Sequence, residues 1–72
     1  METRIIVTGS QTSAIKARRH LEKNGIKTKV VRAPKNPGEG CRFGVETSLS
    51  FVPRATRLLD DERINYSDII KP

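Results

Sequence analysis

The chain has 72 residues, a formal net charge of +6 and one cysteine. Its length predicts a single domain over residues 1–72 with a small core. One cysteine excludes an intrachain disulfide, and no apolar run reaches the roughly 20 residues that a membrane span requires. We therefore expect a cytoplasmic protein with no membrane partner.

The first half of the chain predicts a strand, a helix and a second strand. Residues 4–8 are rich in β-branched side chains, which favour a buried strand. Small and apolar residues then recur at helical spacing up to Leu21, and Gly25 follows as a left-handed stop. Charged and uncharged side chains alternate sufficiently over residues 27–32 to predict the second strand. Three hydroxyl side chains are candidate caps for the helix: Ser10, Thr12 and Ser13.

The second half begins with a loop over residues 33–40, which holds two prolines and two glycines. Residues 43–47 alternate as a third strand, and Ser48 or Ser50 can cap a second helix. The buried stripe of that helix is expected to hold Phe51, Ala55, Leu58 and Leu59. A weaker final strand is expected at Ile64, Tyr66, Ile69 and Ile70.

The order of these elements is β-α-β-β-α-β. Right-handed crossovers place both helices on the same face of the sheet. The sequence therefore predicts the α+β class: a ferredoxin-like sandwich, with a four-stranded antiparallel sheet and two helices on one face.

Charge is unevenly distributed along the chain. Residues 1–42 hold ten basic and three acidic residues, whereas residues 43–72 hold four basic and five acidic residues. A one-sided positive field favours an anionic partner, such as nucleic acid, an acidic protein face or a small anion. The alternative is a solvated surface that keeps a small domain soluble.

Few residues in the chain could carry chemistry. One histidine, His20, and one cysteine give no zinc-binding spacing, and no phosphate-binding glycine loop is present. No cofactor is expected. Ser10 is better explained as a helix cap than as a nucleophile.

Cys41 differs from these residues because of its sequence neighbours. It ends the Pro- and Gly-containing loop, and Gly40 removes side-chain bulk on one side. Lys35 and Arg42 add positive charge, which favours the thiolate and lowers the pKa of a cysteine. Cys41 is thus the candidate reactive group, with Lys35, Arg42, Gly40 and Ser10 as candidate binding residues. The alternative is a buried, inert cysteine that acts as a small hydrophobe.

The order of these features resembles a family, the selenium/sulfur carrier-like proteins, over about the first two thirds of the chain. The matching segments are Ile5-Ile6-Val7, Ser10, Ala14-Ile15-Lys16-Ala17 with Leu21, Gly25-Ile26, Val30-Val31, Ala33-Pro34-Lys35, Cys41 and Phe43-Gly44-Val45. Lys35 stands where the family usually has Arg, and Arg42 stands where it usually has Gly.

The resemblance implies a carrier rather than a stand-alone enzyme. Cys41 would accept sulfur or selenium from a donor enzyme as a persulfide or perselenide and pass it to an acceptor enzyme. Two alternatives remain open: a small basic nucleic-acid-binding module, and an interaction subunit without chemistry of its own. Exposed strand edges would also permit a homodimer.

Overall fold

The structure is a computed structural model that describes residues 2–33 and 42–72. Its elements follow the predicted β-α-β-β-α-β order, with a short 3₁₀ segment, η1, before the second helix. They are β1 (Thr3–Gly9), α1 (Gln11–Lys23), β2 (Lys29–Ala33), β3 (Arg42–Ser48), η1 (Leu49–Phe51), α2 (Val52–Asp61) and β4 (Asp68–Ile70).

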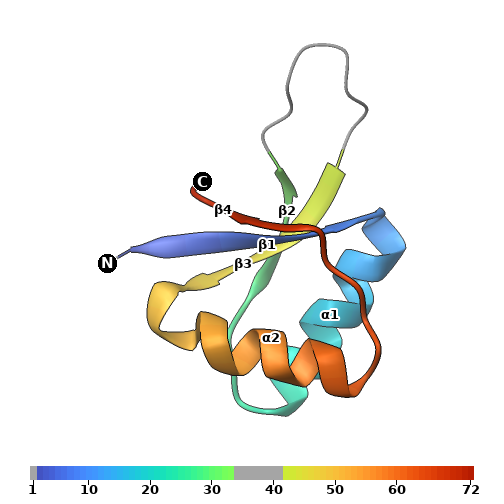
Figure 1. The fold of residues 1–72 in the computed structure, drawn as a ribbon, viewed down its shortest axis with the longest axis vertical. Helices are drawn as coiled ribbons and strands as arrows, with labels where there is room; N and C mark the ends of the chain where they lie inside the picture. Colours follow the sequence, from blue (N-terminus) through green and yellow to red (C-terminus); the bar gives the residue numbers. More distant parts are fainter. Residues whose placement is uncertain (1, 34–41) are drawn as a thin grey trace.

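The four strands form one antiparallel sheet in the order β2-β3-β1-β4. Each helix connects two strands that are not adjacent in the sheet, and both helices lie on the same side of it (Figure 1). This is the ferredoxin-like arrangement, so the predicted fold class is confirmed.

Alternation along the strands divides the apolar side chains between the two faces of the sheet. Ile6 and Val45 are paired across β1 and β3, and both are fully buried against the helices. The helices contribute buried residues to the same cluster, among them Leu21 and Leu59. A smaller cluster, centred on Ile5, Val7 and Ala33, forms on the opposite face.

Gly44 allows the two central strands to approach closely. A Cβ atom at this position would collide with the main-chain oxygen of Ile6 and lie 3.0 Å from Cγ2 of Ile5. The obstacle is backbone in the middle of the sheet, which cannot move without disturbing the pairing of β1 with β3. The position therefore excludes every side chain larger than hydrogen.

Gly44→Ala should destabilise the fold by about 2–3 kcal/mol, because the added methyl group overpacks the centre of the sheet. Urea denaturation of the variant and the parent protein measures the difference. A loss below about 0.5 kcal/mol would show that β1 and β3 can separate easily at this point.

Both helices end with the same backbone hydrogen bonds but with different residues. At the end of α1, Gly25 has φ 85° and its N–H donates to Glu22, while the N–H of Ile26 donates to Leu21. At the end of α2, the left-handed position is held by Arg63, with φ 58°. The Arg63 N–H donates to Asp60 and the Ile64 N–H to Leu59. Glycine normally occupies this position because a Cβ disfavours left-handed backbone.

Arg63→Gly should therefore raise the free energy of unfolding by about 1 kcal/mol, since the strain of left-handed backbone outweighs the greater freedom of glycine in the unfolded chain. Thermal denaturation should show a rise of about 4–8 °C in Tm for a domain of this size. Gly25→Ala provides the matched comparison and should lower Tm. An unchanged or lower Tm for Arg63→Gly would contradict this account.

Three details of the predicted elements are wrong. Neither Ser48 nor Ser50 caps α2; the chain enters it through η1, and its N-cap, Phe51, makes no side-chain capping bond. Phe51 is 40% exposed rather than part of the buried stripe, because it belongs to η1 and precedes the helix. The final strand is limited to Asp68–Ile70, since Ile64 and Tyr66 pack against the core before the chain reaches the sheet.

No helix in residues 2–33 or 42–72 is long and apolar enough to cross a membrane.

Candidate functional site

The predicted site falls partly outside the residues that the structure describes. Cys41, Lys35 and Gly40 lie within residues 34–41, which are not described. Ser10 and Arg42 are described. Arg42 is the first residue of β3 and follows Cys41 directly in the chain.

The sheet register brings Ser10 and Arg42 to the same edge. Gly9, at the end of β1, pairs with Phe43 of β3, and the Thr8 hydroxyl donates to the Phe43 carbonyl at 3.3 Å. Ser10 follows Gly9, and Arg42 precedes Phe43. The start of α1 and the start of β3 therefore lie side by side, and the unpaired N–H groups at the start of a helix favour negative charge nearby.

Ser10 is the N-cap of α1, as predicted. Its Oγ accepts a hydrogen bond from the Ser13 N–H at 3.0 Å and lies 2.8 Å from the Ser13 hydroxyl oxygen. Capping satisfies one of the N–H groups that a helix start leaves without a partner. These contacts assign Ser10 a structural role in the first turn.

Arg42 forms an ion pair with Asp68 of β4, in which its Nη1 donates to Oδ2 at 3.0 Å. Because β1 lies between β3 and β4, the pair crosses β1, where Val7 is the register partner of Asp68. The carboxylate of Asp68 offsets part of the positive charge that Arg42 adds next to Cys41. Nothing in the sequence indicates this partner, which is 26 residues further along the chain.

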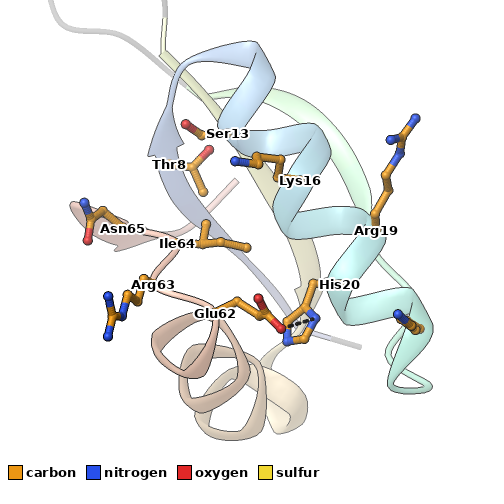
Figure 2. Close-up of a pocket in the computed structure, with 10 residues that line it drawn as sticks. Thr8, Ser13, Lys16, Arg19, His20, Glu62, Arg63, Ile64 and Asn65 are labelled. Atoms are coloured by element: carbon orange, nitrogen blue, oxygen red, sulfur yellow. Dashed lines mark ion pairs between the residues drawn. The ribbon is translucent and has the colours of Figure 1, made fainter.

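A groove of about 660 Å³ opens between α1 and the segment that follows α2; we call it the α1 groove (Figure 2). Thr8 and Ser13 lie near the edge of the sheet just described, so the groove begins there. Its two walls are formed by Lys16, Arg19, His20 and Lys23 on α1 and by residues 62–65 opposite.

His20 and Glu62 connect the two walls of the groove. Nδ1 of His20 lies 4.0 Å from Oε1 of Glu62 (Figure 2). Nε2 of His20 is buried and accepts or donates no hydrogen bond among the described residues. The remaining charged residues of the groove are cations: Lys16, Arg19, Lys23 and Arg63.

Sequence reasoning found only part of this groove. The i, i+3 and i+7 spacing of Lys16, Arg19 and Lys23 places them along one side of the first helix. Arg63 was missed as a neighbour because it belongs to a separate element 40 residues beyond Lys23. The skewed charge of residues 1–42 was the available signal.

The face of the sheet away from the helices carries no aromatic side chain among the described residues. Phe43 and Val45 are two residues apart on β3, so both side chains point to the face of the sheet that the helices cover. On that face the Arg32 guanidinium lies 5.8 Å from the centre of the Phe43 ring. Single-stranded RNA is commonly bound by stacking bases on aromatic residues of such a sheet. Among the described residues, this face of the sheet therefore has no aromatic side chain on which bases could stack.

Comparison with known families gives a match over nearly the whole chain. The family described as "Putative Se/S carrier protein-like" matches residues 3–71. The chain belongs to this family. The match covers α2 and β4 as well as the first two thirds of the chain, where the resemblance was visible in the sequence. No curated protein and no solved structure gives a significant match.

In the part of the chain that the structure describes, no group of three His, Cys, Asp or Glu residues could hold a metal ion.

The effect of the Arg42–Asp68 pair on Cys41, which precedes Arg42 in the chain, can be tested by alkylation. Asp68→Asn removes the carboxylate that offsets Arg42, which should lower the apparent pKa of Cys41 and raise the alkylation rate by iodoacetamide at pH 7 about twofold. Asp61→Asn removes the same charge from the exposed end of α2 and should leave the rate unchanged. Equal rates for Asp68→Asn and the parent protein would show that this pair does not influence Cys41.

Proposed function

We propose that this protein carries sulfur or selenium on Cys41, as a persulfide or perselenide, between a donor and an acceptor enzyme. The observation that carries the proposal is membership of the Se/S carrier-like family over residues 3–71. Cys41 is the only cysteine in the chain, so no other side chain could form a persulfide.

The transfer needs no external oxidant. The Cys41 thiolate attacks the outer sulfur of a persulfide on the donor, so a bond to Cys41 forms while the sulfur–sulfur bond of the donor breaks. The electron pair of the broken bond leaves with the inner sulfur of the donor as a thiolate. A nucleophile of the acceptor then attacks the outer sulfur, and Cys41 is released as a thiolate. Selenium follows the same path through a sulfur–selenium bond.

The surroundings of the β3 start support a thiolate at this position. Consecutive Cα atoms are about 3.8 Å apart, so chain connectivity holds Cys41 close to Arg42 at the head of β3. The start of α1 lies at the same edge of the sheet, through the pairing of Gly9 with Phe43. Cationic side chains and helix N-termini both favour thiolate over thiol.

The proposal is tested by incubating the protein with a cysteine desulfurase and cysteine, or with a selenocysteine lyase and selenocysteine, and measuring its intact mass. A gain of one sulfur or selenium atom is expected, and a reducing thiol should reverse it. Cys41→Ser should show no gain. Cys41 should also react with iodoacetamide near pH 7 faster than free cysteine does.

Two results would contradict the carrier function. The first is a mass that always corresponds to the unmodified thiol, together with alkylation no faster than that of free cysteine. The second is an equal mass gain in Cys41→Ser, which would place the added atom on another group. If the protein is instead an interaction subunit without chemistry, Cys41→Ser should leave its partner binding intact.

A further inference from the structure

We propose that the α1 groove binds an acidic segment of a partner protein. This inference concerns a surface of the described residues and does not need Cys41 to react. It rests on the proposed function only in naming the partner, which would be the donor or the acceptor enzyme.

The first observation is that no carboxylate in the described part of the protein forms an ion pair with the cations of the groove. Elsewhere Arg4, Arg18, Lys29 and Arg42 each form an ion pair with a carboxylate. Lys16, Arg19, Lys23 and Arg63 form none among the described residues and are exposed to solvent. With Glu62 they give the groove a net charge of +3, half of the charge of the whole chain.

The second observation is the direction of these side chains (Figure 2). Lys16 reaches toward the gap between the walls, whereas the guanidinium groups of Arg19 and Arg63 extend outward from the two rims. The cations therefore do not converge on one point, as they would around a single small anion. They cover an open surface, which fits several carboxylates of one extended partner.

The spacing along α1 sets the length of that partner. Lys16, Arg19 and Lys23 fall at positions i, i+3 and i+7, so the row of cations extends along roughly 10 Å of the helix. Carboxylates repeated at similar intervals on one face of a helix, or on alternate residues of an extended chain, match this row. A helical acidic segment of about seven residues, or an extended one of about three to four residues, would span it.

The lining favours protein over nucleic acid. The described residues around the groove include no Phe, Tyr or Trp on which a base could stack, and the one aromatic ring among them, that of His20, is largely buried. Glu62 stands on one wall and would repel a continuous phosphate backbone, whereas a polypeptide can place a neutral or basic residue opposite it. Charge complementarity of this kind increases the association rate and selects partners.

The backbone of Arg63 is left-handed, with φ 58°. At a position where glycine is less strained, the chain has a residue whose side chain does not contribute a hydrogen bond or ion pair within the described protein. Strained backbone of this kind is found preferentially at functional sites. A role for Arg63 in contacts with a partner would explain its presence at the end of α2.

The test measures binding of a fluorescein-labelled ten-residue glutamate peptide to the full chain by fluorescence anisotropy at low salt. The Cys41→Ser chain is used so that persulfide chemistry cannot affect the result. We expect saturable binding that weakens as salt is added. Arg63→Gly should reduce the affinity about two- to fivefold and raise Tm, and the double variant Lys16→Gln, Lys23→Gln should reduce it about tenfold.

The control is Arg57→Gln, which removes an exposed cation of α2 outside the groove. Its affinity for the peptide should stay within a factor of about 1.5. An equal loss in Arg57→Gln and Arg63→Gly would overturn the proposal, because binding would then follow net charge alone. Absence of peptide binding would overturn it as well.

A thymidine decamer decides between protein and nucleic acid. Tighter binding of the decamer than of the glutamate peptide, lost in the groove variants, would overturn the proposal in favour of nucleic acid. The carrier function is judged separately, since a groove that binds the peptide and a Cys41 that gains no sulfur would leave this inference standing and contradict the other.

Discussion

The pairing of β1 with β3 is the constraint on which the rest of the structure depends. These two strands form the centre of the sheet and join the two halves of the chain. Gly44 lets their backbones approach closely. Their register places the end of β1 beside the beginning of β3, so it decides which residues lie near the chain position of Cys41.

The same register brings the features on which the two proposals rest to one edge of the sheet. The start of α1, the Arg42–Asp68 pair and the entrance of the α1 groove all lie there. A carrier must expose its reactive atom while its body contacts two different enzymes. Under the proposed function, a short row of cations that begins near the chain position of Cys41 would orient such an enzyme.

The ends of the two helices show how stability and surface chemistry are divided in a small domain. The end of α1 uses Gly25 in left-handed backbone, whereas α2 uses Arg63 in the same geometry at a cost in stability. Both ends also pack an apolar residue against the core just after the turn: Ile26 is fully buried there and Ile64 is partly buried. Packing thus maintains the end of α2 where the local sequence does not favour it.

The sequence by itself determined the element order and the fold class, and it limited the helix cap to Ser10, Thr12 or Ser13, because hydrophobic periodicity and turn chemistry are local properties. It also singled out Cys41. Only the tertiary structure decided that Asp68 lies against Arg42 and that Arg63 lies across the α1 groove from the cations of α1, since both arrangements join segments far apart in the chain. The exposure of Phe51 was also a tertiary outcome: an η1 turn shifted the start of α2, and periodicity alone cannot locate such a turn.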